Sequence, residues 1–590
     1  MKNDSHLIKK TFYGILIVNI VSMISGVLCV MIDAIITGQF LGTDAVSASG
    51  LLNPVVLICN IIGAVLGPGA SIICTRYMGM AKPEKVNRAF STVMVAMISV
   101  CASVSILLFV FAPSIAALLG SETGNDAIVK MISDYLRGFA FGIIPMCFSH
   151  GLTGLMMLDN DKKRGILGIA VTLVSDIVFD LLNVLVFKGG MFGMALATSL
   201  SSLLGAFVVA SHFLRKERIL HFTFKGLCFK DFKEAVLCGI PNAITLGCNA
   251  VRGIFFNYLL LSFATGSAVA SLSVANSSFA VVAAISMGMF ASTSTICSLL
   301  FGEEDREGIT QSLTHSLRTV IISFFVITSL LFIFAKPFAG LFLESSASEE
   351  LIQAARFIRF MAVRMFIVSV SISLSGAYQG IRKLGLNYSI DILREGILPV
   401  VCALIMGKIS GLFGFELSFV VSGVILLVYV FVIPIIKNKR ISFRSSDLLM
   451  LPESFGSKPE DTYAYSITDM NSVMQASRDV YDFCLKKGFE KRMSNTTSLF
   501  IEEMAGNTVM HGFRKGKSGH IDLRVICKQG TLVIRIRDDG IPFDPVDWLK
   551  RNHPDDPLSG VGIRIIVGLA EEVRYVPAMG LNNILIKVKN

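Results

Sequence analysis

The chain has 590 residues, of which 53% are hydrophobic and only 16% are charged, and its formal net charge is +10. This composition excludes a soluble globular protein, a disordered chain and a disulfide scaffold. Hydrophobicity is uneven, because apolar runs fill roughly residues 12–436 and the sequence beyond them is polar with alternating strand patterns. We therefore expect a membrane module joined to a water-soluble one.

The N-terminus and the cysteines fit this division. The segment MKNDSHLIKK precedes an apolar run without a small-residue cleavage site, which indicates an uncleaved signal-anchor helix. Most of the twelve cysteines lie inside apolar runs, with no CxxC pair and no Cys/His cluster. We expect them to be reduced, packed side chains rather than metal ligands or disulfides.

Helices long enough to cross a membrane follow one another through the apolar region. A bilayer core of about 30 Å is crossed by about 20 apolar residues in a helix. Apolar runs broken by charges, glycine and proline predict twelve such helices, near residues 12–37, 48–73, 89–112, 131–157, 165–188, 192–214, 235–262, 268–300, 316–341, 353–380, 386–408 and 412–436.

Basic residues are concentrated in alternate loops between these helices. One set of loops, with the segment after the last helix, holds Arg76, Lys82, Lys85, Arg88, Lys162, Lys163, Arg164, Arg215, Lys216, Arg218, Lys225, Lys230, Lys233, Arg306, Arg382, Lys383, Lys437, Lys439 and Arg440. The other set holds Lys130, Lys188, Lys336 and Lys408. Such asymmetry records membrane orientation and not nucleic-acid binding. It predicts a multi-pass protein of a bacterial-type cell (inner) membrane with both termini in the cytoplasm, and an even number of helices also places the termini on one side.

The two halves of the apolar region align without a gap after a shift of 223 residues, which places Gly79 on Gly302 and preserves the helix boundaries. Six helices followed by six in the same orientation predict a parallel repeat, with lobes at 1–222 and 223–440. Two such bundles around a central cavity suit a transporter, and a duplicated scaffold without transport is the alternative.

A known family shares these features. The segment MIDAIITGQFLGTDAVSASG, the basic Arg76–Arg88 loop and the duplicated halves resemble the MATE (multidrug and toxic compound extrusion) transporters over about residues 10–440. The resemblance implies a cation antiporter that exports small, usually cationic organic compounds by using a proton or sodium gradient. Related flippases of lipid-linked sugars share the wider fold, so the substrate class stays open.

Carboxylates inside the predicted helices are candidates for ion coupling, since an ionisable residue at mid-bilayer costs about 2.5–3.5 kcal/mol. Asp33 lies on the first helix, and Asp176 and Asp180 lie one turn apart on one face of the fifth. Facing carboxylates cannot all ionise cheaply in a low dielectric, so they can exchange a proton or share a monovalent cation. Thr198 on the sixth helix can add a hydroxyl ligand.

The MATE resemblance implies a cation site in the N-terminal lobe that matches this set by helix and spacing. The family pattern often has an amide where Asp176 stands, so the choice between H⁺ and Na⁺ stays open. After the shift of 223 residues the three acids fall on Phe256, Pro399 and Ala403. We therefore expect ion coupling in the N-terminal lobe alone, with hydrogen-bonded stabilisation of that lobe as the alternative role.

The C-terminal lobe carries a different set of charges within its helices, namely Arg252, Arg364, Asp391, Arg394 and Glu395. We expect acid–base pairing among them, with substrate contact as the alternative. We expect His150, on the fourth helix, to be a hydrogen-bonded core histidine rather than a proton relay.

Beyond the membrane region, residues 441–465 have the composition of a linker, and 466–590 predict one small α+β domain. Its predicted helices lie near 471–487 and 493–511, and its strands at 521–527, 531–538, 572–577 and 583–589.

Two motifs of this domain suit nucleotide chemistry. Glu503 and Asn507 stand one helical turn apart, where the carboxylate can activate a hydroxyl and the amide can hold Mg²⁺ beside phosphates. In the DDGIPFD segment that ends a strand, Asp538 can accept a hydrogen bond from an adenine amino group, and Gly540 lets the backbone come close.

A third motif, with Gly560 and Gly562, precedes a helix whose N-terminal amides can cradle phosphate oxygens. The three motifs in this order resemble the Bergerat-type ATP-binding fold of histidine kinases, Hsp90 and gyrase over about 120 residues, and DDGIPFDP most resembles the anti-sigma-factor serine kinases. The resemblance implies Glu503 as base, Asn507 as Mg²⁺ ligand and Asp538 as the adenine-binding residue.

Together these features predict a polytopic all-α membrane protein with 12 transmembrane helices in two parallel six-helix repeats, plus a cytoplasmic Bergerat-type domain. The predicted function is secondary active efflux of a small, cationic molecule by H⁺ or Na⁺ antiport, regulated by a domain that binds ATP and Mg²⁺. That domain senses nucleotide, phosphorylates a cytoplasmic regulator protein or sequesters it.

Three alternatives stay open. The first is a membrane-anchored signalling kinase, and the second is a lipid-linked oligosaccharide flippase, which would need cavity cations such as Arg252 and Arg364. The third is an ATP-binding domain without catalysis; Asn582 and Asn583 stand where a threonine is usual.

Overall fold

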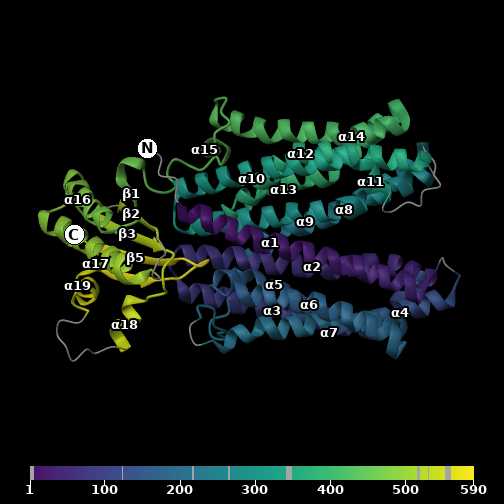
Figure 1. The fold of residues 1–590 in the computed structure, drawn as a ribbon, viewed down its shortest axis with the longest axis horizontal. Helices are drawn as coiled ribbons and strands as arrows, with labels where there is room; N and C mark the ends of the chain where they lie inside the picture. The colour runs from purple at the N-terminus through teal and green to yellow at the C-terminus, as the bar shows by residue number, and fades with distance from the viewer. Residues whose placement is uncertain are drawn as a thin grey trace.

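The computed structural model describes residues 6–121, 124–215, 218–263, 266–340, 348–513, 519–528, 530–551 and 560–589. Two helical lobes lie side by side, and a small domain sits against one end of both (Figure 1). Both termini lie at this end, which is called the domain end below.

The two lobes consist almost entirely of long helices. The N-terminal lobe contains α1 (His6–Ile36), η1 (Thr37–Leu41), α2 (Thr43–Gly79), α3 (Pro83–Gly120), α4 (Asp126–Ala140), α5 (Ile143–Leu158), α6 (Lys162–Leu182), η2 (Asn183–Phe187), α7 (Gly190–Ala210) and η3 (Ser211–Leu214). The C-terminal lobe contains α8 (Phe229–Phe263), α9 (Gly266–Gly302), α10 (Arg306–Ile333), α11 (Ala335–Gly340), α12 (Ser348–Gly380), α13 (Leu384–Ile392), η4 (Leu393–Ile397) and α14 (Leu398–Asn438).

Ten helical stretches of the described chain are long and apolar enough to cross a membrane, and α4 with α5 forms one more, bent by 51°. The stretch Leu384–Asn438 has 55 residues, about 82 Å of helix and more than twice a bilayer core. Its backbone leaves the helical region at Ser410 and Gly411, and Lys383 and Lys437 at its two ends interact directly. This stretch therefore folds back and crosses twice, which assigns a crossing to each of the twelve predicted ranges.

The lobes touch each other through α1 and α2 on one side and α8 and α9 on the other. At the domain end, a Cβ on Gly79 would lie 2.1 Å from the Leu299 carbonyl oxygen, and one on Gly302 would lie 2.2 Å from that of Arg76. These are the two glycines that the sequence repeat superimposes. Only glycine lets two helix backbones come this close. The two repeated glycines therefore allow the lobes to pack tightly against each other at this end.

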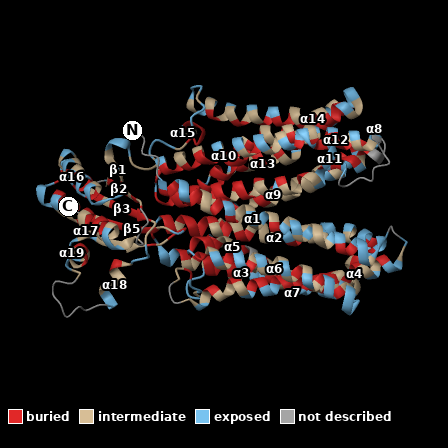
Figure 2. Cartoon of the chain, in the orientation of Figure 1, coloured by how far each residue is buried: buried red, intermediate tan, exposed pale blue. Residues whose placement is uncertain are grey.

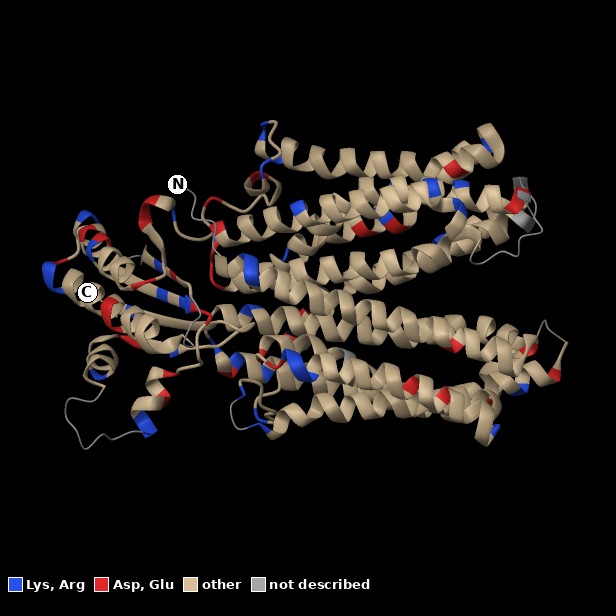
Figure 3. Ribbon diagram, viewed as in Figure 1, with Lys and Arg blue, Asp and Glu red and all other residues tan. Residues whose placement is uncertain are grey.

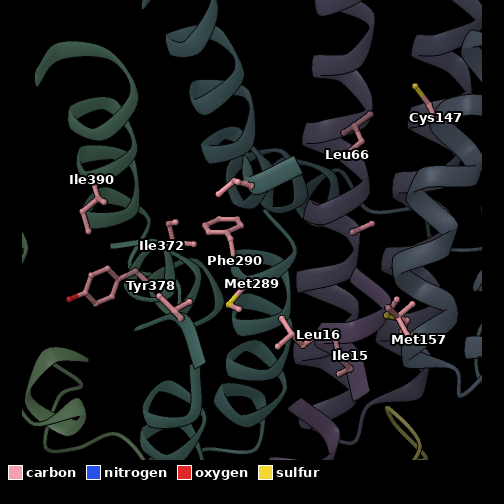
Figure 4. Packing of buried hydrophobic residues seen from close by; sticks show 14 of the residues in the cluster. Ile15, Leu16, Leu66, Cys147, Met157, Met289, Phe290, Ile372, Tyr378 and Ile390 are labelled. Carbon is pink, nitrogen blue, oxygen red and sulfur yellow. The ribbon is translucent and has the colours of Figure 1, made fainter. Parts of the chain in front are cut away.

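Buried residues gather where the lobes meet the domain, whereas the middle of many helices is exposed on its outer side (Figure 2). A continuous apolar core joins the lobes. Figure 4 shows part of it, with Leu16 of α1 close to Met289 of α9. The exposed large apolar side chains, such as Ile106 and Val110 on α3, suit contact with lipid.

The C-terminal domain has a five-stranded antiparallel sheet in the order β1-β2-β3-β5-β4. Its strands are β1 (Thr462–Ile467), β2 (Ile521–Lys528), β3 (Thr531–Asp538), β4 (Glu572–Tyr575) and β5 (Asn582–Lys589). Its helices are α16 (Met470–Lys486), α17 (Lys491–Asn507), η6 (Thr508–Gly512), α18 (Pro545–Arg551) and α19 (Val561–Leu569). The predicted helices and four predicted strands are present, and β1 is an additional strand that begins in the range expected to be linker and ends two residues inside the predicted domain.

The rest of the expected linker lies along the C-terminal lobe and includes the short helix α15 (Ser445–Leu448) and the 3₁₀ turn η5 (Pro459–Asp461). The Tyr378 hydroxyl donates to the Leu448 carbonyl over 2.7 Å. The rings of Phe301 and Phe455 stack with centroids 4.9 Å apart. This segment is therefore attached to the lobe at two points along its course.

Candidate functional site

Three carboxylates meet inside the N-terminal lobe. Asp33 of α1 and Asp176 and Asp180 of α6 offer oxygens that all lie within 4.8 Å of one another. Asp176 and Asp180 are 2% and 0% exposed. Their spacing puts both on one face of α6, and α6 packs on α1 and α7. The structure thus brings together the three acids that the sequence singled out.

Hydroxyl and thiol groups surround this cluster. Ser201 of α7 donates to Asp176 Oδ1 over 2.8 Å, and Thr198 and Cys29 also lie within hydrogen-bonding contact of Asp176. Sequence reasoning found Thr198 but missed Ser201, although the two stand three residues apart and share a helix face. Tyr135 of α4 lies close enough to interact electrostatically with the three acids.

Several oxygens of the cluster have no partner. Among the described residues, Asp33 Oδ1 and both carboxylate oxygens of Asp180 are buried without a hydrogen bond. Buried carboxylate oxygens are strongly destabilising unless a proton or a cation joins them. The helix also widens into the π-helical turn η2, which begins three residues after Asp180, a distortion common at functional sites. The cluster can therefore bind a proton or a small cation.

The charges of the C-terminal lobe form the pairs expected from the sequence. Glu395 contacts Arg252 over 2.6 Å and Arg394 over 2.9 Å, and Arg394 contacts Asp391 over 3.0 Å. Arg364 instead donates to the backbone carbonyl of Arg394 over 2.6 Å. The side chain of His150 lies outside the described residues.

In the C-terminal domain, hydrogen bonds fix the carboxylate of Asp538. The Gly540 N–H and the Asn582 side-chain amide both donate to its Oδ1, over 2.8 and 2.7 Å. Asn582, which stands where the resemblance implies a threonine, therefore orients the acid. The Ile541 N–H donates to the Gly512 carbonyl over 2.7 Å, which holds the Asp538 loop against the end of the Glu503 helix. Burial raises the pKa of Asp538, although the bonds from Asn582 and Gly540 oppose the shift.

The other nucleotide motifs converge on the same region. Gly560 caps α19 with a φ of +67°, which favours glycine. A Cβ on Gly562 would lie 1.8 Å from Glu503 Oε2, so the phosphate-side turn and the Glu503 carboxylate adjoin. Asn507 lies one turn further along α17. This donor set fits an adenine nucleotide: an oriented acid for the base, helix-terminal amides for phosphate and an acid–amide pair for Mg²⁺.

Comparison with known proteins identifies both modules. The sequence matches the MatE family over residues 19–182 and 241–390, which is more than half of the chain. The chain is a member of the MatE family. Residues 468–586 match the histidine kinase-like ATPase domain. This MatE protein is therefore a multi-pass membrane transporter that carries an ATP-binding domain. No curated protein matches the chain.

Solved structures share the MatE fold. An outward-facing multidrug resistance MATE transporter of the MOP superfamily is 19% identical with a TM-score of 0.66, and the match covers 72% of this chain and 94% of that one. A MOP-superfamily transporter from Pyrococcus furiosus, whose binding pocket is described as having reverse polarity, is 19% identical with a TM-score of 0.64 and coverages of 72% and 95%. These similarities show the fold.

A contact that the sequence did not predict joins the ATPase domain to both MatE lobes. Along β2 and β3, side chains such as Leu523 and Ile536 face the helices of the domain, while Arg524, Arg535 and Arg537 alternate with them. These arginines face the lobes. Charged residues are accordingly dense in the domain and at the domain end of the lobes, and sparse along the middle of the helices (Figure 3).

The arginines bind an acidic turn between α9 and α10. Glu303, fully buried, contacts Arg535 over 2.9 Å and also Arg537. Asp305 contacts Arg537 over 3.1 Å and Arg524 over 3.3 Å. Burial favours a higher pKa for Asp305, but Arg524 and Arg537 outweigh it and lower the pKa below the ordinary value. We call this ion-pair group, formed by Glu303, Asp305, Arg524, Arg535 and Arg537, the clamp.

The domain contacts the N-terminal MatE lobe at the same time. Arg535 donates to the Gly79 carbonyl over 3.3 Å, and Arg574 donates to the Ala81 carbonyl over 2.7 Å. The Met579 N–H donates to the Leu158 carbonyl over 3.2 Å. One rigid sheet thus holds the closed domain ends of both lobes together.

Proposed function

We propose that this MatE protein exports small organic compounds in exchange for H⁺ or Na⁺ bound by Asp33, Asp176 and Asp180, and that its ATPase domain regulates the exchange. The observation that carries the proposal is the group of buried, unpartnered carboxylate oxygens in the N-terminal lobe. An ion that neutralises them stabilises one arrangement of the lobe, and its release favours another. The sequence resemblance gives cationic compounds as the expected cargo.

The orientation follows from charge. The loops at the domain end contain most of the basic loop residues, so the positive-inside bias supports a cytoplasmic location for this end and for both termini. ATP is then available to the domain. We further propose a bacterial-type cell membrane as the location of the protein.

We infer that the domain binds ATP through Asp538 at the base and through the turn at Gly560 and Gly562 at the phosphates. Asn507 would hold Mg²⁺, and Glu503 would act as the base toward a hydroxyl. When bound, the nucleotide supplies a transferable phosphate. Binding of the nucleotide can change how the sheet of the domain contacts the lobes, whether or not its phosphate is transferred.

The clamp favours regulation of the attached transporter over a separate signalling role. Alternating access requires the domain ends of the lobes to separate at some stage. Ion pairs from one sheet reach the α9–α10 turn of the C-terminal lobe, and a hydrogen bond from the same sheet reaches the Gly79 carbonyl at the end of α2 in the N-terminal lobe. The docked domain therefore stabilises the state that is closed at the domain end, and its release permits opening.

Efflux from proteoliposomes containing the full chain tests this function. A panel of organic compounds is followed under an imposed ΔpH or ΔNa⁺, with and without ATP. We expect Asp33→Asn to lower gradient-driven efflux at least about tenfold, since it removes one of the charged ligands. The matched control is Asp44→Asn, which changes an exposed acid of the same lobe and should leave efflux unchanged. Normal efflux by Asp33→Asn would refute the ion site.

A further inference from the structure

The C-terminal lobe contains a cavity of about 560 Å³ between α8, α9, α12, η4 and α14. Phe256, Phe279 and Phe290 form part of an apolar wall. Phe290 and Ile372 of this wall lie beside each other in Figure 4. Amides such as that of Asn276 interrupt the wall. The volume is sufficient for a small organic molecule.

Charge in this cavity is unbalanced. Arg252, Arg364 and Arg394 line it, against a single lining carboxylate, Glu395. Asp391 pairs with Arg394 from outside the lining. Even with both acids ionised, three guanidinium groups face two carboxylates, which leaves an excess of one positive charge.

Arg364 has no directly paired carboxylate among the described residues, although the Glu395 charge acts on it from a longer distance. The Arg364 side chain is 8% exposed. Its Nη2 atom donates to the Arg394 carbonyl, whereas its Nε has no hydrogen-bond partner. Arg394, 6% exposed, likewise has an Nη1 atom without a partner. A buried guanidinium without an anion is strongly destabilising.

Two neighbouring arginines with unused N–H groups are suited to one oxyanion. Guanidinium groups bind carboxylates and phosphates through parallel N–H···O bonds in a fixed planar geometry. The acids of the N-terminal lobe are not part of this cavity, so they do not compete for Arg364. The aromatic wall can pack against the apolar part of the same ligand.

We propose that this cavity binds the carboxylate or phosphate group of an amphipathic organic compound, with Arg364 and Arg394 as the anion ligands. The inference deepens the proposed function, because it makes the cargo an anion or a zwitterion rather than a simple cation. The same chemistry is found in a soluble organic acid and in a lipid headgroup.

Binding to the purified full chain in detergent tests the proposal by calorimetry. The probes are 1-naphthoate, 1-naphthylmethylamine, which has the same ring with opposite charge, and short-chain phosphatidylglycerol. We expect an anionic probe to bind at least about tenfold more tightly than the amine. Arg364→Gln should weaken that binding about ten- to a hundredfold, as expected for loss of a charge-assisted hydrogen bond. Saturable binding of 1-naphthoate identifies a soluble acid, and binding of the phospholipid alone identifies a headgroup.

The matched control is Arg356→Gln on the same helix. Arg356 is about half exposed, pairs with Glu416 and does not line the cavity, so anion affinity should be unchanged. If Arg364→Gln does not fold, Arg364→Lys, which keeps the charge and loses the planar fork, should weaken binding by a smaller factor. Equal binding of the amine, or an anion affinity that neither Arg364 variant changes, would overturn the proposal.

This outcome is separable from that of the proposed function. Asp33→Asn should lower coupled efflux at least about tenfold and leave anion binding intact. Anion binding that depends on Arg364 without any gradient-driven efflux would defeat the antiport proposal alone.

Discussion

The buried ion pairs of the clamp allow a quantitative prediction for a variant at Glu303. Glu303→Gln keeps the shape of the side chain and removes the charge that faces Arg535 and Arg537, which are 6% and 7% exposed. Removing one partner of a buried ion pair costs about 3–5 kcal/mol. The docked state should therefore lose roughly a hundredfold to several thousandfold in its equilibrium with an undocked domain.

The backbone amide of Met579 provides a direct readout of this equilibrium, because it donates across the contact to the Leu158 carbonyl. Hydrogen exchange of a peptide covering residues 576–581, measured by mass spectrometry on the full chain, should accelerate by at least about a hundredfold in Glu303→Gln. An unchanged exchange rate would refute the reasoning that buried charge holds the domain in place.

Lys528→Ala is the matched control. Lys528 lies on the same sheet and contacts Glu304 of the same turn over 2.7 Å, but both side chains are more than half exposed. Such surface pairs contribute less than about 1 kcal/mol, so exchange should change by less than about fivefold. An effect as large as that of Glu303→Gln would show that burial does not determine the strength of the contact.

Three further changes test other parts of the structure. Asn582→Ala removes the amide that orients Asp538 and should weaken ATP binding about tenfold in calorimetry on the full chain, and an unaltered affinity would contradict that role. Gly302→Ala puts a Cβ 2.2 Å from the Arg76 carbonyl and should cost about 1–3 kcal/mol, seen as faster exchange over 576–581. Because the docked pKa of Asp305 lies below its ordinary 3.8, its contribution to docking is complete above about that pH and is lost only as the pH falls further. Protection of the same peptide, corrected for intrinsic exchange, should be equal at pH 7 and pH 5, and a loss between them would point to another group.

The sequence was sufficient for the helical region because one physical requirement dominates there. A chain in lipid must satisfy its backbone hydrogen bonds within helices, so each apolar run between charges became a helix. Even the reversal at Ser410 and Gly411 falls in the gap predicted between residues 408 and 412. The proximity of Asp176 to Asp180 followed from helical spacing, and only their approach to Asp33 required the family resemblance.

The clamp could not be predicted from the same patterns. Alternation along β3 places Arg535 and Arg537 on the polar face of the sheet, but a polar face is ordinarily solvated. Nothing local connects these residues to Glu303, which is more than two hundred residues away in the sequence. Likewise β1 is short and follows Pro459, and it becomes a strand only because β2 offers it an edge.

Helix α1 is the physical link among these parts. It carries Asp33 toward one end, it packs on α6 of its own lobe and α9 of the other, and near its start Lys10 forms an ion pair with Asp539. Asp539 directly follows Asp538, the residue assigned to adenine. Burial favours a higher pKa for Asp539, but Lys10 holds it below the ordinary value, so the pair is charged at neutral pH. A change in the nucleotide loop therefore acts on the same helix that forms one wall of the ion site, without passing through the clamp. If nucleotide regulates the exchange as we propose, two routes are open to it, one through the closure of the lobes and one through α1.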